Sequence, residues 1–223
     1  MHCTLLIDLM HISEIFYSIQ GEGTNIGAPA IFIRLAGCHL RCIWCDSKFT
    51  WDMKSGEEMS TAAIIKQIKK YPCKHLVITG GEPLIQQSGI KELLIELPGY
   101  YVEIETSGSL LPQINDLIDQ YNCSPKLSNS KNRPINYSAV LPKFPQEKTW
   151  YKFVIDNKKD LKEVKTMIKK CGLSNEKIIL MPQGITRKEI AEKSPWIAEI
   201  CKKENWRFST RLHIEIWGNK RGV

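Results

Sequence analysis

Three cysteines close together could hold a metal cluster. Cys38, Cys42 and Cys45 fall within eight residues, and no fourth cysteine lies near them. Thiolates are soft ligands that bind zinc or iron–sulfur clusters. Structural zinc sites usually take four ligands, whereas three thiolates on a four-iron cluster leave one iron open to another molecule. The alternative is a zinc loop completed by His39, which directly follows Cys38 and is poorly placed to close a tetrahedron.

Two hard oxygen donors follow the last of these cysteines. Asp46 carries a carboxylate and Ser47 a hydroxyl, and Mg²⁺ prefers oxygen ligands of this kind. The same two residue types also suit the N-cap of a helix. The pair therefore predicts either a magnesium site beside the cysteines or the start of a helix.

A glycine-rich loop and one arginine precede the cysteines. The loop at residues 18–23 reads Ser-Ile-Gln-Gly-Glu-Gly. Glycine lets a ligand approach the backbone, and Gln20 and Glu22 can each recognise the edge of a flat heterocycle. The loop has no lysine, so it is not a phosphate cradle. Arg34 could bind a carboxylate through two parallel hydrogen bonds. A plain hairpin turn and a surface arginine are the alternatives.

Length and composition are those of an ordinary soluble globular protein. Its 223 residues, with 43% hydrophobic and 25% charged side chains, suit one domain or two, and we expect a single domain over residues 1–223. No apolar run is long enough to span a bilayer, and residues 1–10 lack the features of a signal peptide. The other five cysteines are scattered singly, at positions 3, 73, 123, 171 and 201. Single free thiols fit a reducing compartment, so we expect a cytoplasmic protein.

The net charge of +7 comes largely from lysines. Many of them lie in residues 157–170, where apolar residues recur at helical spacing. This stretch is typical of an amphipathic helix with a solvated lysine face that ends at Gly172. Because no base-reading motif accompanies the lysines, we expect no direct binding of nucleic acid.

Strands and helices that position these residues are expected to alternate. The predicted strands cover residues 30–35, 75–79, 101–106, 150–155, 177–181 and 211–217. The predicted helices cover residues 60–71, 89–97, 111–121, 157–170 and 195–205, the last capped by Ser194. Residues 128–148, with three prolines, are expected to form a long surface excursion.

Alternating strands and helices favour parallel βα units and an α/β fold. A full eightfold barrel needs about 250 residues, so an incomplete, TIM-like βα barrel suits this chain better. The turns at residues 80–83, 106–108, 124–126 and 181–184 follow predicted strand positions, as the cysteine loop does. Since chemistry collects at the carboxyl ends of barrel strands, these turns are expected to meet at one rim.

The cysteine loop resembles the signature of the radical S-adenosylmethionine (SAM) superfamily, C-x3-C-x-aromatic-C, with Trp44 as the aromatic residue. The Gly-Gly-Glu-Pro turn at residues 80–83 resembles a second motif of that superfamily. Further motifs make the chain similar to the 7-carboxy-7-deazaguanine synthase family, and they extend from end to end. They read SIQGEG, FIRLAGCHLRCIWCDSKFTW from residue 32, TGGEP, ETSG, SPK and the terminal WGNKRGV.

This resemblance implies a carbon–nitrogen lyase with a partial barrel of the radical SAM type. Its substrate would be 6-carboxy-5,6,7,8-tetrahydropterin and its product 7-carboxy-7-deazaguanine, formed with loss of ammonia in 7-deazapurine (queuosine-type) biosynthesis. The implied cofactors are a [4Fe–4S] cluster, SAM and Mg²⁺. A 5′-deoxyadenosyl radical from SAM would take a hydrogen atom from the substrate and return it, so no side chain is implied as a catalytic group beyond the cluster and SAM. The cofactor performs the hard step, and the protein orients the reactants.

The resemblance also implies a role for individual residues. The cluster would be held by Cys38, Cys42 and Cys45. SAM would be contacted by Trp44, Cys45, Asp46, Gly80, Gly81, Glu82, Gly108, Ser124, Pro125, Lys126, Met181, Pro182, Gln183 and Gly184. The pterin would be contacted by Ile19, Gln20, Gly21, Arg34, Thr106 and Val223, the last through its carboxylate. Ser47 would bind Mg²⁺ at a position where the family more often has threonine.

The implied partners are a small-molecule pterin, an electron donor of the flavodoxin or ferredoxin type, and a second copy in a homodimer, with no membrane. Two other classes stay open. A radical SAM activase acting on a protein would share the cysteines and the Gly-Gly-Glu-Pro turn, but would not need the loop at 18–23 or Arg34. A non-catalytic cluster or zinc module would need only the cysteines.

Overall fold

The computed structural model describes residues 9–223. Residues 1–8 lie outside the described part, and so do Cys3 and most of residues 1–10, for which no signal peptide was predicted. A single sheet runs through the molecule in the order β3-β1-β2-β4-β5-β6-β7-β8-β9. Its strands are β1 Met10–Ile19, β2 Pro29–Leu35, β3 Glu57–Met59, β4 His75–Gly80, β5 Tyr101–Thr106, β6 Gln120–Cys123, β7 Thr149–Ile155, β8 Ile178–Pro182 and β9 Arg207–Phe208. From β2 to β9 every pairing is parallel, and β1 is antiparallel to both β2 and β3.

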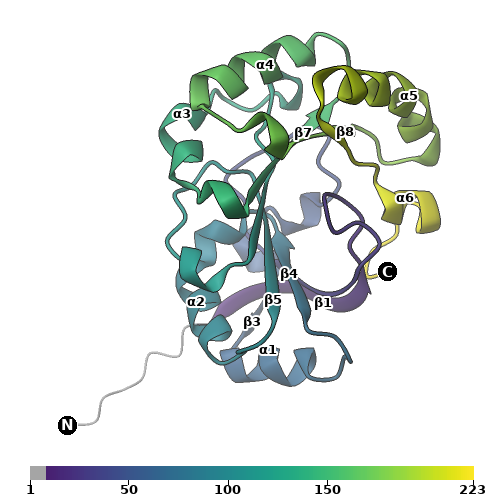
Figure 1. Cartoon of the computed structure of the whole chain (residues 1–223). Coiled ribbons are helices and arrows are strands. Elements are labelled where there is room, and N and C mark those ends of the chain that lie inside the picture. Colours follow the sequence, from purple (N-terminus) through teal and green to yellow (C-terminus); the bar gives the residue numbers. More distant parts are fainter. Residues whose placement is uncertain (1–8) are drawn as a thin grey trace.

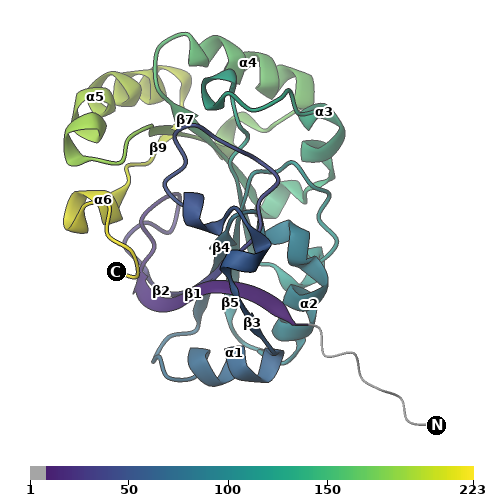
Figure 2. The ribbon, with the colours of Figure 1, turned by 180° about the vertical axis from the view of Figure 1, so that it is seen from behind.

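The helices are α1 Thr61–Ile68, α2 Gln87–Ile95, α3 Tyr137–Val140, α4 Asp160–Cys171, α5 Arg187–Glu204 and α6 Leu212–Trp217. Helices α1 to α5 follow the outer side of the curved sheet (Figure 1, Figure 2). The loop between β1 and β2 and helix α6 lie at the other, open side. The edge strands β3 and β9 do not pair with each other, so the expected α/β fold, an incomplete barrel, is confirmed.

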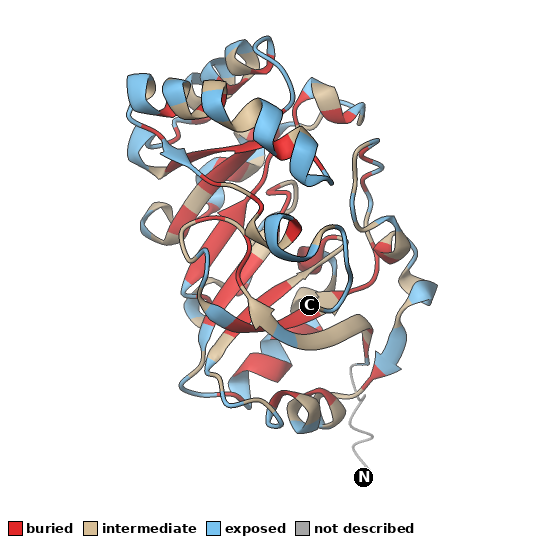
Figure 3. Ribbon diagram, turned by 90° about the vertical axis from the view of Figure 1, so that its right-hand side faces the viewer, coloured by how far each residue is buried: buried red, intermediate tan, exposed pale blue. Residues whose placement is uncertain are grey.

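The inner strands are buried on both faces, as parallel strands covered by helices must be. Strands β2, β4 and β8 each contain three buried Ile, Leu or Val side chains, and Figure 3 shows the sheet as the buried centre of the molecule. Among residues 9–223, no helix combines the length and the apolarity that a membrane crossing requires.

Predictions for most of the elements are confirmed by the structure. The strand at 101–106 has the predicted bounds, and four others are correct to within a residue or two. Ser60 caps α1 by accepting a hydrogen bond from the Ala63 amide. The lysine-rich helix is α4, which ends at Gly172 in the left-handed conformation.

The helix predicted at residues 111–121 is wrong. A single 3₁₀ turn, Asn115–Leu117, is followed by strand β6. All four residues of β6 are buried between β5 and β7. Pairing on both sides outweighs the local preference of this stretch, because strand formation depends on its neighbours.

Two other predictions, both for the second half of the chain, are wrong. Residues 211–217 were expected as a strand, but α6 occupies most of them and only Ile214 of this helix is buried. Strand β9 already holds the place beside β8, so the alternating pattern has no strand to pair with. The stretch 128–148 is not a surface excursion: it includes α3 and places Tyr137, Leu141 and Phe144 in the core.

Helix α5 begins earlier than predicted. Thr186 and Glu189 form a capping box at its start, and Pro195 lies inside the helix, not at its beginning. Pro195 and Ala191 are both exposed. The carbonyl of Ala191, which lacks its usual helical donor because proline has no N–H, can therefore face water.

The two helix starts can be distinguished by mutation. We expect Thr186→Ala to lower the free energy of unfolding by about 1 kcal/mol, the usual loss for an N-cap. Ser194→Ala serves as control, because the Ser194 hydroxyl donates only to the Ile190 carbonyl within the helix, and it should have a much smaller effect. Urea unfolding of both variants measures this, and a larger loss for Ser194→Ala would support the start at Pro195.

Candidate active site

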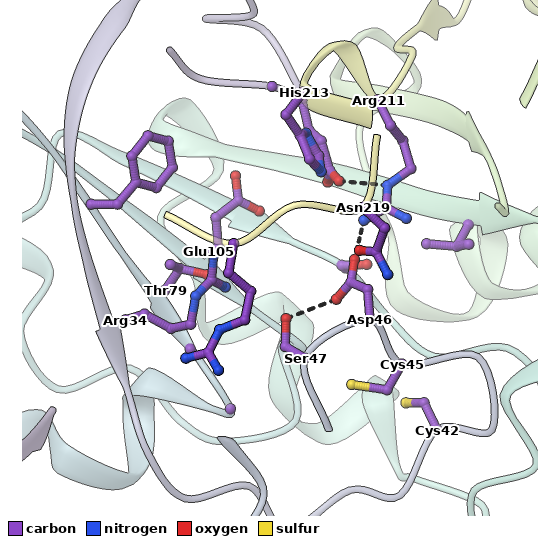
Figure 4. A pocket seen from close by; sticks show the side chains of 18 of the residues that line it. Arg34, Cys42, Cys45, Asp46, Ser47, Thr79, Glu105, Arg211, His213 and Asn219 are labelled. Atoms are coloured by element: carbon purple, nitrogen blue, oxygen red, sulfur yellow. Dashed lines mark hydrogen bonds and ion pairs between the residues drawn. The ribbon is translucent and has the colours of Figure 1, made fainter. Parts of the chain in front are cut away.

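One large cavity lies at the carboxyl ends of the parallel strands. Residues from the ends of β2, β4, β5 and β8, from the loops that follow them and from the C-terminal segment line it. Figure 4 shows side chains from these separate segments pointing into a common space. The expectation that the motifs meet at one rim is therefore met by the fold.

The cysteine loop forms one wall of the cavity. The thiols of Cys38, Cys42 and Cys45 all line it and are free. Cys42 Sγ accepts a hydrogen bond from Asn132 Nδ2 at 3.0 Å, and Cys38 Sγ accepts one from the Leu40 amide at 3.4 Å. Donors to sulfur suit a thiolate bound to iron. Burial raises the pKa of Cys38 to about 11, so metal binding must displace the proton. Three inward thiols with donors to two of them fit a cluster.

The zinc alternative has no support in the geometry. His39 is exposed, and its Nε2 lies 2.9 Å from the hydroxyl of Ser109. In residues 9–223, no three His, Cys, Asp or Glu side chains are grouped to hold a single metal ion. A cubane cluster is larger than one ion and accommodates thiols that are further apart.

The Gly-Gly turn after β4 packs tightly against the start of the cysteine loop. A Cβ at Gly80 would lie 2.2 Å from the Leu35 carbonyl oxygen, and one at Gly81 would lie 2.2 Å from that of Gly37. No other residue type fits at these positions. The Gly81 amide donates to Leu35 O at 3.0 Å, and the Glu82 amide donates to Gly37 O at 2.9 Å.

Glu82, predicted to contact SAM, is buried beside the cavity. Its side chain is 1% exposed and does not line the cavity. The carboxylate accepts hydrogen bonds from the Thr106 hydroxyl at 2.7 Å and the Ser107 amide at 2.8 Å. Glu82 therefore joins the turn after β4 to the turn after β5. Gly108 and Pro125 also lie outside the cavity lining.

The other residues predicted for SAM do line the cavity. They are Trp44, Cys45, Asp46, Gly80, Gly81, Ser124, Lys126, Met181, Pro182, Gln183 and Gly184. Lys126 Nζ donates to the Ser124 hydroxyl at 3.0 Å and lies 5.6 Å from the centre of the Trp44 ring. This wall offers an aromatic face and backbone polar groups to a ligand such as SAM.

Ser47 turns toward Asp46 within the cavity wall. Its hydroxyl donates to Asp46 Oδ1 at 2.8 Å (Figure 4). Ser47 occupies the N-cap of the 3₁₀ turn Lys48–Thr50, but its side chain makes no capping hydrogen bond. The hydroxyl is therefore available to a cation beside a carboxylate, which matches the preference of Mg²⁺.

Arg34 lies in the same cavity with part of its guanidinium free. Nε donates to Glu14 Oε1 at 2.6 Å, and the guanidinium lies 5.7 Å from the centre of the Phe16 ring. Among residues 9–223 its two Nη groups make no hydrogen bond. They can donate in parallel to a bound carboxylate.

The remaining residues predicted for the pterin also line the cavity: Ile19, Gln20, Gly21, Thr106 and Val223. Gln20 is almost fully buried, and its Nε2 donates to Glu103 at 3.1 Å and Glu105 at 3.3 Å. The side chain of Gln20 thus orients these two carboxylates. Gly21 lies against the ring of His213, where a Cβ would be 2.1 Å from Nδ1.

A network of charges in the cavity wall was missed by the sequence analysis. Lys152 Nζ lies 2.6 Å from Glu22 Oε2 and 2.9 Å from Glu105 Oε2. Arg211 Nε lies 2.9 Å from Glu22 Oε1, and its Nη2 pairs with Asp46. Lys152 is 3% exposed. A lysine inside the otherwise apolar strand β7 was the available signal, since a buried charge needs partners.

The network controls the charge of its members. Burial alone would raise the pKa of Glu22, but Lys152 and Arg211 outweigh it and hold this pKa well below its ordinary value. Burial would lower the pKa of Lys152, yet Glu105 and Glu22 raise it. Burial raises the pKa of Glu105, although Lys152 opposes the shift. Glu22 and Lys152 are therefore ionised at neutral pH.

Comparisons with known proteins agree with this arrangement. The Radical SAM superfamily model matches residues 32–192. The 7-carboxy-7-deazaguanine synthase of Pyrobaculum aerophilum is 40% identical over 96% of this chain and 97% of its own. That of Escherichia coli is 29% identical over 91% and 96%. The solved structure of QueE from Escherichia coli has a TM-score of 0.73 and 27% identity, covering 92% of this chain and 95% of its own.

The chain belongs to the 7-carboxy-7-deazaguanine synthase family of the radical SAM superfamily. It is an enzyme that uses a [4Fe–4S] cluster and SAM and acts on a small molecule. The solved structure of Streptococcus suis SuiB bound to SAM, 16% identical with a TM-score of 0.54, shares the fold.

The importance of Lys152 can be measured. We expect Lys152→Met to lower the free energy of unfolding by about 3 kcal/mol, because it leaves the charges of Glu22 and Glu105 without their shared partner. The control is Lys165→Met, whose partner Glu204 lies on the surface and whose loss should cost at most about 1 kcal/mol. Equal losses in urea unfolding would show that the Lys152 network does not stabilise the fold.

Proposed function

We propose that this enzyme converts 6-carboxy-5,6,7,8-tetrahydropterin to 7-carboxy-7-deazaguanine with loss of ammonia, in 7-deazapurine (queuosine-type) biosynthesis, as a single domain over residues 1–223. Family membership supports the activity. The observation that carries it is one cavity that combines three inward thiols with the free Nη groups of Arg34. An activase acting on a protein would have no use for a carboxylate-binding arginine inside the cavity.

Cys38, Cys42 and Cys45 would hold the cluster. When bound, the cluster and SAM supply reversible hydrogen-atom transfer, which is the hard part of the reaction. Trp44, Lys126 and the backbone of residues 181–184 would hold SAM, since they line the same cavity. Glu82, which the family resemblance places at the amino group of SAM, would also fix the turns around this site through Thr106 and Ser107.

The chain's own residues would orient the pterin. Arg34 would bind the substrate carboxylate while Glu14 holds its Nε in place. Glu105 lines the cavity, and burial raises its pKa. A hydrogen bond from an N–H group of the pterin would stabilise the ionised form of this carboxylate. Ser47 would bind Mg²⁺ together with substrate oxygens.

The electron that the cluster requires would come from a flavodoxin- or ferredoxin-type donor. We also propose a homodimer and a cytoplasmic location. The free thiols of the described cysteines support a reducing compartment.

Product analysis tests the function and the cluster together. Protein purified without oxygen is incubated with SAM, dithionite, Mg²⁺ and the carboxytetrahydropterin, and products are identified by mass. We expect 7-carboxy-7-deazaguanine from the parent protein and none from Cys42→Ala. Cys171→Ala is the control, because Cys171 lies in the core at the end of α4. A Cys42→Ala protein without iron that still forms product would overturn the proposal.

Arg34→Ala should weaken substrate binding strongly. Removing one partner of a buried charge pair typically costs about 2–5 kcal/mol. The spectroscopic change that SAM causes at the cluster should persist, because Arg34 belongs to the pterin side. Arg207→Ala is the control, since Arg207 is exposed on β9 outside the cavity. Overlapping substrate titrations for Arg34→Ala and the parent would contradict this role.

Ser47→Ala should lower the rate and reduce its dependence on Mg²⁺, whereas Ser47→Thr should be tolerated. Mg²⁺ needs oxygen ligands and binds weakly to one neutral hydroxyl, so the site is expected to form with substrate bound. Rates are measured against Mg²⁺ concentration. If the dependence stays unchanged while the melting temperature falls, Ser47 stabilises the fold and is not a ligand.

A further inference from the structure

The outer side of the cysteine loop carries a surface that the substrate cavity does not use. Arg41 and Ile43 flank Cys42 in the chain and are exposed, while Cys42 is buried and lines the cavity. Neither Arg41 nor Ile43 lines the cavity. The loop therefore presents its thiols to the cavity on its inner face. On its outer face, the residues directly before and after Cys42 are exposed to solvent.

Residues 131–133 are hydrogen-bonded to this loop and repeat its pattern, with a less exposed residue between two exposed ones. Lys131 and Arg133 are exposed on either side of Asn132, which is half-buried. Asn132 Nδ2 donates to Cys42 Sγ at 3.0 Å, and its Oδ1 accepts from the Arg41 amide at 2.7 Å. The Ile43 amide donates to the Ser130 carbonyl at 3.1 Å. These bonds hold the two outer faces together over the Cys42 thiol.

The outer surface combines basic side chains with one exposed apolar side chain. We define it by Arg41, Ile43, Lys131 and Arg133 and name it the outer basic patch. Ile43 is 56% exposed. No ion pair among residues 9–223 involves the three cations. Near the patch, the carboxylate of Glu163 accepts hydrogen bonds from the amide and hydroxyl of Ser128 and does not pair with any of the three cations.

We propose that the outer basic patch is where an acidic one-electron carrier protein docks to reduce the cluster. This inference rests on the proposed function, because it requires the cluster at Cys38, Cys42 and Cys45. One electron would leave the carrier, oxidising a flavin hydroquinone to its semiquinone, and reduce the cluster by one electron. No atom is transferred.

Three observations select this occupant. The unpaired positive charges complement an acidic surface and speed its association. The exposed Ile43 supplies an apolar contact within the patch. The patch lies outside the cavity lining, so a docked carrier leaves the substrate cavity open while it approaches Cys42 from the other side.

A second basic surface on the molecule provides a matched control. Lys162 and Lys169 lie on α4 and line a shallow groove against α5. Both are exposed, and neither takes part in an ion pair within the described chain. The double variant Lys162→Glu/Lys169→Glu changes the net charge as much as Lys131→Glu/Arg133→Glu does. Arg41 is left unchanged, because its Nη1 donates to the carbonyls of Cys38 and Leu40.

The experiment measures binding and electron transfer with an acidic flavodoxin as probe. Cluster-loaded protein is mixed anaerobically with flavodoxin hydroquinone at about 0.05 M and about 0.5 M salt, where charge screening differs strongly. We expect Lys131→Glu/Arg133→Glu to slow cluster reduction and weaken flavodoxin binding at least about tenfold at low salt. Ile43→Ser should weaken binding at both salt concentrations. Reduction by dithionite and iron content should stay unchanged.

Equal effects of the two charge-reversal pairs, or a larger effect of the α4 pair, would overturn the proposal. So would flavodoxin binding by the parent protein that does not depend on salt. Failure of the proposed function would be separate, since it would appear in the parent protein as absence of iron and of product with dithionite. Product formed with dithionite together with unaltered flavodoxin binding in Lys131→Glu/Arg133→Glu would reject the patch alone.

Discussion

The close approach of β4 to β2 at their carboxyl ends is the constraint on which the site depends. Gly80 and Gly81 have no Cβ, so their turn can lie against the backbone of Leu35 and Gly37. The amides of Gly81 and Glu82 then bond the carbonyls of those residues. Because Gly37 directly precedes Cys38, the turn and the cysteine loop are held as one unit. Glu82 extends this unit to β5 through Thr106 and Ser107.

Ion pairs hold together the segments that form another wall of the cavity. Glu22, Glu105 and Asp46 come from different parts of the chain and share the two cations Lys152 and Arg211. Burying charges is costly unless they are paired, so this network tolerates little displacement of the strands and loops that supply it. It also leaves three carboxylates with two cations. Glu105, whose pKa burial raises, is the member for which a ligand's hydrogen-bond donor would matter most.

The cysteine loop separates two environments. Its inner face presents thiols to the cavity, and its outer face presents Arg41 and Ile43 to solvent. Asn132 links the two by bonding the Cys42 thiol and the Arg41 amide. Chemistry that must be shielded from water and exchange with a protein partner can thus occur on opposite sides of one loop.

Local sequence alone determined the cysteine spacing, the Gly-Gly turn, and the parallel strands that precede them. These features depend on neighbouring residues: a strand such as 101–106 is visible in its own alternation, and three cysteines within eight residues must share one loop. The partial barrel followed from the alternation of elements and the chain length. Most predicted SAM and pterin residues line the cavity because strand ends in such a fold converge.

Tertiary structure decided what depends on distant partners. Residues 120–123 became a strand because β5 and β7 pair with them, and residues 212–217 became a helix because β9 had taken the place beside β8. Glu82 joins the turns after β4 and β5 because Thr106 and Ser107 bind its carboxylate. Arg211 meets Asp46 across 165 positions of sequence. No local pattern predicts such a pair, because the energy of a buried charge is set by whatever the complete fold places beside it.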